Sequence, residues 1–265
     1  MNRLIIILFL TTSFAFSQEI KYHNPYLDFE IDGIYYLFGH EVAFRTEPDK
    51  KSQVIDILKI GDEIIVLEKS EKSVDYYGIE SFYYKVNYNK KIGYILGSLI
   101  SLEKKEIDNS KYFFTYGKDE EKFYLIIRHL NEQLIIKEIV AELATIEFSI
   151  DIYKGKGIKE IDNIIFINYL AEACGVDGGG IYFFQTGNEL KKVFEIIQVT
   201  DAGVYWIFEN LIFPTDEKGV KGKIVYEKEI GDYKDEETNW IEISKVSREL
   251  EWKNGEILPK LDPEK

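Results

Sequence analysis

Short runs of β-branched, aromatic and other apolar residues alternate with turn-forming residues along most of the chain. Such runs favour pleated, half-buried strands over helices. Gly, Asn, Asp and Thr gather between them at 88–90, 117–119, 186–188, 200–203 and 253–255, where they signal turns. Spacings of about 8 to 14 residues are typical of antiparallel hairpins. The predicted strands are 53–58, 63–67, 82–87, 91–96, 112–116, 122–128, 133–139, 163–169, 180–185, 204–208, 222–227, 240–244 and 249–252.

One segment within this pattern is also compatible with a helix. Residues 134–144 contain Glu138, Glu142 and two alanines, all of which suit a helix. We favour a strand there, since the segments on either side are β-rich. The chain is therefore predicted to be all-β.

The first seventeen residues have the form of an export signal. A positive start at Arg3 precedes the apolar run 4–10, and Ala15 and Ser17 are small residues at the −3 and −1 positions of a cleavage site before Gln18. The apolar run is shorter than the ~20 residues that span a membrane, although a retained anchor is the alternative. We expect an exported protein, periplasmic or extracellular, with no transmembrane segment after cleavage.

Composition narrows the class of protein. Hydrophobic residues make up 45% of the chain, which is enough for a folded core. The formal net charge of −14 becomes −15 once Arg3 is removed, because residues 1–17 contain no acid. A nucleic-acid partner is therefore not expected, since it requires a positive potential. Cys174 is the single cysteine, so no intramolecular disulfide, lipid anchor or thiolate metal site is expected.

A polar stretch divides the mature chain into two parts. Residues 103–109 lack apolar alternation and are predicted to be a linker. The larger part after it contains two-strand units without a clear repeat period, so a sandwich and a partial-propeller meander are equally acceptable. The predicted divisions are an export signal 1–17, a lead-in 18–34, a small domain 35–102, the linker 103–109, a β-rich domain 110–256 and a tail 257–265.

Four pieces occur in order within the small domain: 43–48, 54–67, 83–86 and 91–99. Pro48 ends the first strand, and Gly61-Asp62 makes a tight turn between two apolar strands. Gly93 allows the last strand to kink or bulge next to Tyr94. These features predict a small curled β-sheet.

The ordered set resembles the bacterial SH3-like (SH3b) domain. That family has an Arg-x-x-Pro strand, an apolar strand, Lys-x-Gly-Asp, a second apolar strand, an aromatic-Lys-Val strand and a Gly-Trp/Tyr-Val/Ile strand. Here the matching residues are Arg45 to Pro48, Lys59 to Asp62, Tyr84 to Val86 and Gly93 to Ile95. The resemblance covers about 35–102 and implies a small SH3-like barrel, so the expected fold is this barrel followed by a larger antiparallel β domain.

The resemblance implies recognition rather than catalysis. Exported members accompany cell-wall enzymes or bind peptidoglycan or peptide through a shallow aromatic groove. The chain departs from the family in having Tyr83 or Tyr84 where Trp is usual, and in its long acidic loop 68–81. The alternative is that these aromatic residues fill the barrel. The candidate groove residues are Tyr76, Tyr77, Phe82, Tyr84, Tyr88 and Tyr94.

Residues with catalytic or metal-binding chemistry are sparse. His23, His40 and His129 form no zinc-binding motif. His129 precedes Cys174, and no histidine follows it, which reverses the order in cysteine peptidases that accompany SH3-like domains. The glycines around Cys174 are followed by neither Lys-Ser nor Lys-Thr, so they predict a hairpin turn rather than a phosphate site.

Acidic clusters at Glu138/Glu142, 119–121 and 235–237 fit solvated faces in a chain with 47 acids, and none has the spacing of a calcium loop. We therefore assign no catalytic residue, metal ligand or cofactor. The preferred function is an exported bacterial binding or scaffolding protein whose partner is peptidoglycan, or an envelope protein or peptide. The alternatives are a cell-wall hydrolase with an unrecognised active site in the larger domain, and an acidic inhibitor or immunity protein directed against a basic enzyme.

Overall fold

The computed structural model describes residues 20–131, 136–170, 178–201, 204–235 and 240–261. Within these ranges the chain forms antiparallel β-sheets and one short 3-10 helix, η1 (Gly97–Leu99). The predicted all-β class, with a small curled sheet followed by a larger antiparallel part, is confirmed. The export signal, Cys174 and the last four residues lie outside the described ranges.

The first sheet has the strand order β1-β4-β5-β6-β2-β3 and forms the curled sheet expected of the barrel. Its inward positions alternate with outward ones along each strand, so that Val42, Phe44, Ile64, Val66 and Val86 are buried. Its strands are β1 (Ile34–Tyr36), β2 (Glu41–Arg45), β3 (Val54–Lys59), β4 (Glu63–Tyr76), β5 (Ile79–Tyr88) and β6 (Lys91–Leu96).

The remaining strands form two further antiparallel sheets. The second sheet has the order β10-β9-β8-β7, and the third is an eight-stranded meander in which every strand pairs with its neighbour in sequence. The second contains β7 (Lys104–Ile107), β8 (Ser110–Asp119), β9 (Lys122–Leu130) and β10 (Ile136–Glu142). The third contains β11 (Phe148–Lys154), β12 (Asn163–Tyr169), β13 (Gly178–Thr186), β14 (Glu189–Asp201), β15 (Tyr205–Ile212), β16 (Ile224–Asp235), β17 (Trp240–Lys253) and β18 (Glu256–Leu258).

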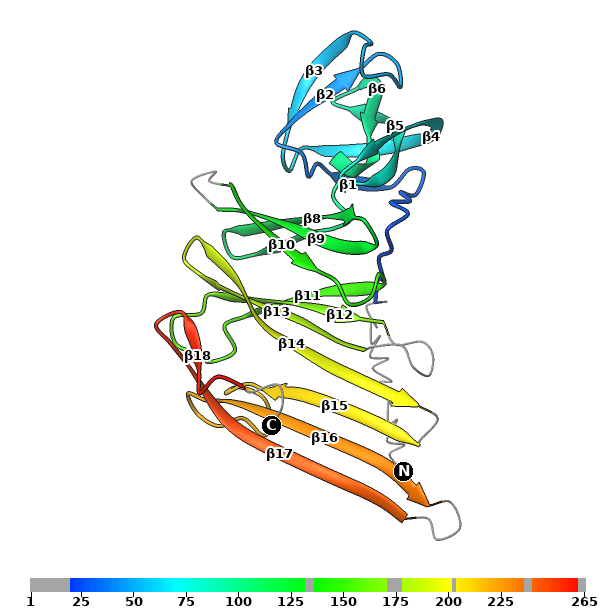
Figure 1. Cartoon of the computed structure of the whole chain (residues 1–265). Helices are drawn as coiled ribbons and strands as arrows, with labels where there is room; N and C mark the ends of the chain where they lie inside the picture. The colour runs from blue at the N-terminus through cyan, green and yellow to red at the C-terminus, as the bar shows by residue number, and fades with distance from the viewer. Residues whose placement is uncertain (1–19, 132–135, 171–177, 202–203, 236–239, 262–265) are drawn as a thin grey trace, which may run out of the picture.

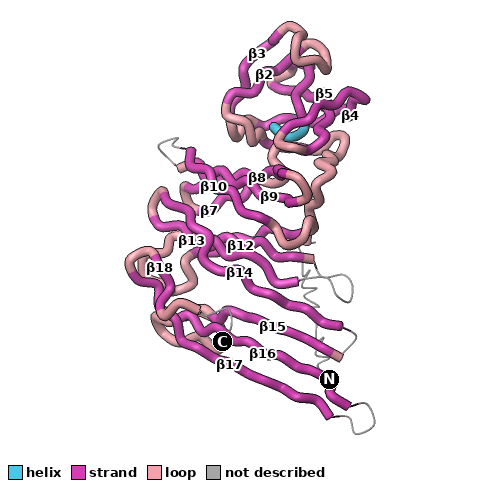
Figure 2. Tube along the Cα trace, in the orientation of Figure 1, coloured by secondary structure: helices cyan, strands magenta, loops and turns pink. Residues whose placement is uncertain are grey.

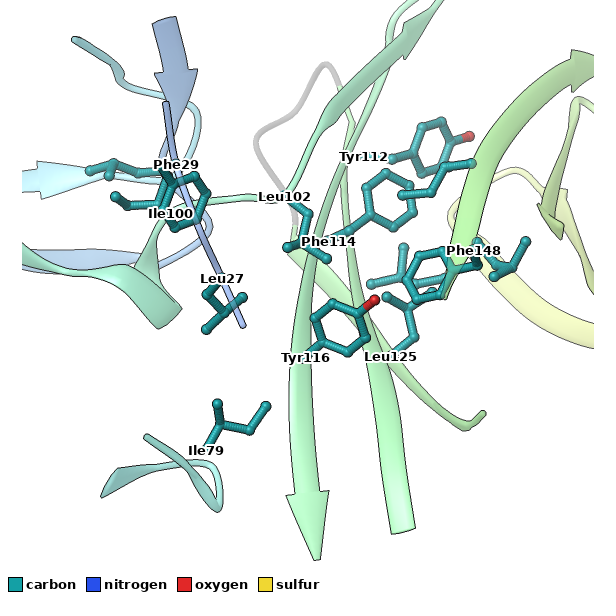
Figure 3. Close-up of a cluster of buried hydrophobic side chains, with 14 of the residues drawn as sticks. Leu27, Phe29, Ile79, Ile100, Leu102, Tyr112, Phe114, Tyr116, Leu125 and Phe148 are labelled. Atoms are coloured by element: carbon teal, nitrogen blue, oxygen red, sulfur yellow. The ribbon is translucent and has the colours of Figure 1, made fainter. Parts of the chain in front are cut away.

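The second sheet lies between the barrel and the third sheet (Figures 1 and 2). Strand β8 is buried on both of its faces. Phe113 contacts the barrel at Gly61, whereas Tyr116 packs against Phe148 of the third sheet with ring centroids 5.4 Å apart. Figure 3 shows Phe114 and Tyr116 on the side of Phe148, with Leu27 of the lead-in and Ile100 of the barrel on the other side of the strand. One hydrophobic core therefore runs through all three sheets.

A second core lies in the third sheet. It joins Ile158 and Ile161, in the connection after β11, to Phe184, Leu211 and Leu250, among others, of β13, β15 and β17. Strand β13 is consequently buried along almost its whole length. The far ends of β15–β17 extend beyond this core, where the side chains of Trp240, Ile241 and Ile243 are exposed.

Buried polar groups cross-link the second and third sheets. The Tyr112 hydroxyl donates to Gln185 Oε1, and Asn163 Nδ2 donates to the same oxygen at 2.7 Å. Gln185 Nε2 donates to Ser110 Oγ at 3.2 Å, and Ser110 Oγ lies 3.1 Å from His129 Nε2. The His129 ring is stacked on Tyr112 and is 1% exposed. These polar contacts fix the position of the second sheet relative to the third.

Several boundaries differ from those predicted. The stretch 103–109 contains β7, because it pairs with β8 along Lys104–Ile107 despite its polar sequence. Strands β11 and β14 were not predicted, and the segments 240–244 and 249–252 are parts of the single strand β17. The helical alternative for 134–144 is wrong where the chain is described, since Ile136–Glu142 pairs with β9.

The lead-in before β1 runs alongside all three sheets (Figure 1). His23 forms a β-bridge with Phe148 of the third sheet, and its Nε2 lies 3.1 Å from Glu103 Oε2. Further along, the Leu27 carbonyl accepts a hydrogen bond from the buried Tyr84 hydroxyl of the barrel at 2.9 Å.

Among the described residues, no helix is long and apolar enough to cross a membrane.

Substitution of Gly78 tests the contact between the barrel and the second sheet. Gly78 has φ +73°, and an added Cβ would lie 2.0 Å from the Lys118 carbonyl oxygen of β8. We expect Gly78→Ala to lower the free energy of unfolding, measured by urea denaturation, by more than the ~1–3 kcal/mol cost of the strained backbone alone. Gly222→Ala is the matched control, because Gly222 has φ +72° and no atom within 4 Å of the added Cβ. An equal loss of unfolding free energy in the two variants would show that Gly78 makes no close contact with β8 that matters for stability.

Burial of His129 predicts a pH-dependent stability. Burial lowers the pKa of His129 below its ordinary value. Below about pH 6.5 the unfolded chain therefore binds a proton that the folded chain does not, and stability falls as the pH is lowered towards the folded-state pKa. Burial raises the pKa of Asp151, which gives an opposite slope, so the wild type must be compared with His129→Gln. As the pH is lowered from 7 to 5, the unfolding free energy of the wild type should fall relative to that of His129→Gln. A pH-independent difference would be inconsistent with a buried neutral imidazole.

Candidate functional site

The six aromatic residues predicted to line a groove do not form one surface. Tyr76 and Tyr77 lie at the tip of the β4–β5 hairpin, with ring centroids 4.7 Å apart. Tyr88 lies near the other end of β5, where its hydroxyl donates to Asp62 Oδ2 at 3.3 Å. Tyr94 is opposite Lys85 and Arg45 in register, on the outer face of the sheet. The structure therefore brings together only Tyr76 and Tyr77 among these four.

Tyr84 belongs to the barrel core. Its side chain is 1% exposed, and its ring packs edge-on against Phe29 at 5.2 Å. Burial raises the pKa of its hydroxyl, and Lys69 partly offsets this effect. A ligand on the surface cannot contact this ring. Tyr84 therefore fills the interior of the barrel, as the alternative for these aromatic residues predicts.

The hairpin tip holds the barrel against the second sheet. Tyr77 and Gly78 both have positive φ, as the two central residues of a type I′ hairpin turn require. The Tyr77 carbonyl accepts a hydrogen bond from the backbone N–H of Lys118 at 2.7 Å. The tip of the β4–β5 hairpin is thus anchored on β8. Residues along the side of this hairpin form one wall of a cavity.

Phe82 is the predicted groove residue that lines this cavity, which we call the junction cavity. It has a volume of about 350 Å³ and lies where the lead-in, the β4–β5 hairpin and the β8–β9 hairpin meet. The lead-in provides Pro25, Tyr26 and Asp28, the β4–β5 hairpin provides Lys69, Gly78, Ile79, Glu80 and Phe82, and the β8–β9 hairpin provides Lys118 and Phe123.

Each of the two lysines of the junction cavity lies over an aromatic ring. Lys69 Nζ is 4.6 Å from the centroid of Phe82, and Lys118 Nζ is 5.2 Å from that of Phe123. Burial disfavours the charged form of Lys69, but hydrogen bonding and charge interaction with Asp28 outweigh this, and its pKa is raised. The Glu80 carboxylate accepts a hydrogen bond from Ser73 at 2.8 Å. The cavity therefore presents two ammonium groups, two carboxylates and an apolar floor.

This combination suits a ligand that carries both an apolar group and charges of either sign. The aromatic rings provide flat apolar surface, and the four charged side chains provide partners for a carboxylate and an amine. Sequence reasoning found Phe82 but missed Lys69, Lys118 and Phe123. The unusual length of the 68–81 loop was a signal for Lys69, whereas no sequence pattern placed β8–β9 beside it.

Two of the three histidines make structural contacts. His129 and Ser110 form a hydroxyl–imidazole pair, but Gln185 bonds the same hydroxyl and Tyr112 covers the imidazole ring. His23 pairs with Glu103 in the lead-in contact. Within the described ranges, no group of three or more His, Cys, Asp or Glu side chains could hold a metal ion.

Comparison with known proteins bears on the barrel alone. No curated protein and no solved structure matches the chain significantly. A protein-family model does match one segment, and no other family is recognised. This segment begins just before β2 and ends just after η1, so it covers most of the barrel and leaves out the second and third sheets. Residues 40–101 match the family described as the bacterial SH3 domain.

Proposed function

We propose that this chain is an exported bacterial binding protein without catalytic activity that recognises a cell-wall peptide at the junction cavity. The observation that carries the proposal is the position of Phe82, Lys69 and Lys118, where the bacterial SH3 domain meets the second sheet. A domain of this family supports a binding module. The cavity offers that module a concave surface with both apolar and charged groups.

The charges of the cavity favour a peptide of the cell wall over a polyanion. Two lysines are balanced by Asp28 and Glu80 within the lining, so the cavity has no excess of positive charge. Stem peptides of the wall carry free carboxylates, amines and small apolar side chains close together. Lys118 is the better candidate for binding a ligand carboxylate, because Lys69 already pairs with Asp28. An exposed peptide segment of an envelope protein has the same groups and is the alternative ligand.

Retention on purified peptidoglycan tests the proposal. We expect the full mature chain to sediment with insoluble peptidoglycan, and Phe82→Ala and Lys118→Gln each to reduce the retained fraction severalfold, because they remove an apolar and a cationic contact. Tyr94→Ala is the matched control, since Tyr94 is an aromatic residue on the outer face of the same sheet. Circular dichroism establishes that each variant is folded.

Three results would contradict parts of this proposal. Absence of retention would remove wall binding. Soluble fragments released from the peptidoglycan would support the hydrolase alternative. Full retention of both cavity variants, together with loss in Tyr94→Ala, would place the ligand on the outer face of the barrel instead.

Export is tested separately by fractionating cells that express the full chain. We expect the protein outside the cytoplasm, beginning at Gln18, because residues 1–17 carry the pattern of a cleaved signal. N-terminal sequencing and intact mass identify the first residue. Replacing two leucines of the apolar run 4–10 with lysine should keep the protein in the cytoplasm. A cytoplasmic wild-type protein that retains Met1 would overturn the proposal of export.

A further inference from the structure

The outer ends of β15–β17 in the third sheet lie far from the barrel (Figure 1) and carry exposed aromatic side chains. Trp206, Gly231 and Ile243 are opposite one another on β15, β16 and β17, and Phe208, Glu229 and Lys245 form the next such row. Residues opposite one another in a ladder share a face, as do residues two apart on one strand. These two rows therefore define one face of the sheet, which we call the distal face.

Gly231 makes room for the indole of Trp206. A Cβ at position 231 would lie 2.0 to 2.4 Å from ring atoms of Trp206, so the ring lies directly against the glycine backbone. Indole Nε1 donates a hydrogen bond to Glu229 Oε1 at 3.1 Å. Lys245 and Trp206 lower the pKa of Glu229 by hydrogen bonding, which keeps this acceptor ionised. The ring is thus fixed across the sheet by contacts on one side and along one edge.

The surroundings of this ring are apolar and open. Phe208 and Ile243 on the same face are 45% and 51% exposed. Exposed apolar side chains of this size, grouped around a fixed aromatic ring, are typical of recognition surfaces. The distal face therefore offers an open aromatic platform.

Hydrogen-bonding groups lie beside the platform. A hollow of about 380 Å³ next to Phe208 is lined by Asn210, Glu227, Glu229, Lys245 and Ser247, among others. Lys245 Nζ is 2.6 Å from Glu229 Oε2, so these two charges neutralise one another. Lys228, which also lines the hollow, pairs with Glu209 at 3.3 Å, so Glu227 is the exposed carboxylate that lies beside an amide and a hydroxyl. Such a lining suits an uncharged ligand rich in hydroxyl groups better than a polyanion or a polycation.

We infer that the distal face binds an extended β-1,4-linked glycan chain. The apolar C–H face of a pyranose ring stacks on Trp206 or Phe208, and its equatorial hydroxyls donate to Glu227 and accept from Asn210. A β-1,4-linked chain is an extended ribbon, so successive sugar rings can contact the aromatic side chains and the polar groups of the hollow together. A second copy of this chain is a poorer occupant, because each copy carries a net charge of −14 and the apolar side chains are interrupted by charged ones.

This inference does not depend on peptide binding at the barrel. In Figure 1 the β4–β5 and β8–β9 hairpins, which line the junction cavity, lie far from the outer ends of β15–β17, which carry the distal face. A chain that binds through both would attach to the glycan and the peptide of one polymer at separate points, and the two contacts would reinforce one another. Each site can therefore be removed while the other is measured.

Soluble hexasaccharides test the distal face. We expect the full mature chain to bind chitohexaose or cellohexaose in isothermal titration calorimetry, with a change in tryptophan fluorescence. Trp206→Ala should weaken this binding about tenfold or more, because it removes the stacking surface. Gly231→Ala should weaken it severalfold while keeping the indole, because the new methyl group displaces the ring. Flexible α-1,6-linked dextran should not bind.

Trp240→Ala is the matched control. Trp240 is a tryptophan on β17 that is 60% exposed and lies three residues before Ile243, so alternation along the strand points it away from the distal face. This variant and Phe82→Ala should bind the hexasaccharides as the wild type does. Failure of both hexasaccharides to bind, or unchanged binding by Trp206→Ala, would overturn the inference. A dimer in sedimentation velocity that Trp206→Ala dissociates would assign the face to a second copy instead.

Discussion

The burial of both faces of strand β8 is the constraint on which the rest of the structure depends. Tyr112, Phe114 and Tyr116 are buried on one face and Phe113 on the other, and each buried aromatic ring contributes about 1.5–3 kcal/mol relative to exposure. One face needs the barrel as a cover, and the other needs the third sheet. Loss of the third sheet would expose the three aromatic side chains on one face of β8, and loss of the barrel would expose Phe113 together with Ile126 and Leu130 of β9. The barrel, the second sheet and the third sheet are therefore packed as one unit.

This packing gives the barrel a binding surface that it does not have alone. The junction cavity exists because the β4–β5 hairpin is anchored on Lys118, which brings Phe82 close to Phe123. The third sheet, in contrast, grows beyond its core at the ends of β15–β17. There it forms a single layer whose faces are exposed, and the contact of Trp206 with Gly231 fixes an aromatic ring on one of them.

Local patterns predicted much of the fold and little of the site. Strands such as β6 and β12 agree with their predicted bounds, because their alternation and flanking turns are encoded within a few residues. Residues 103–109 have no strand pattern of their own and so predict a linker, whereas β7 forms there because it pairs with β8. Of the six candidate groove residues, Phe82 lines the cavity and Tyr84 is in the core. Alternation along β5 places both on the same side and does not determine which of them remains exposed.

The sequence by itself determined the all-β class, the presence of the SH3-like segment and the strongly negative charge, because each depends on composition or on short-range order. The tertiary structure decided which aromatic side chains are covered and which charged groups meet. The lead-in, Lys69 and Lys118 are distant along the chain and meet only when the lead-in and two hairpins pack together. The Trp206 platform likewise requires β15 and β16 to pair in the register that puts the indole opposite Gly231. Contacts of this kind depend on strand register and sheet packing, which no short-range pattern encodes.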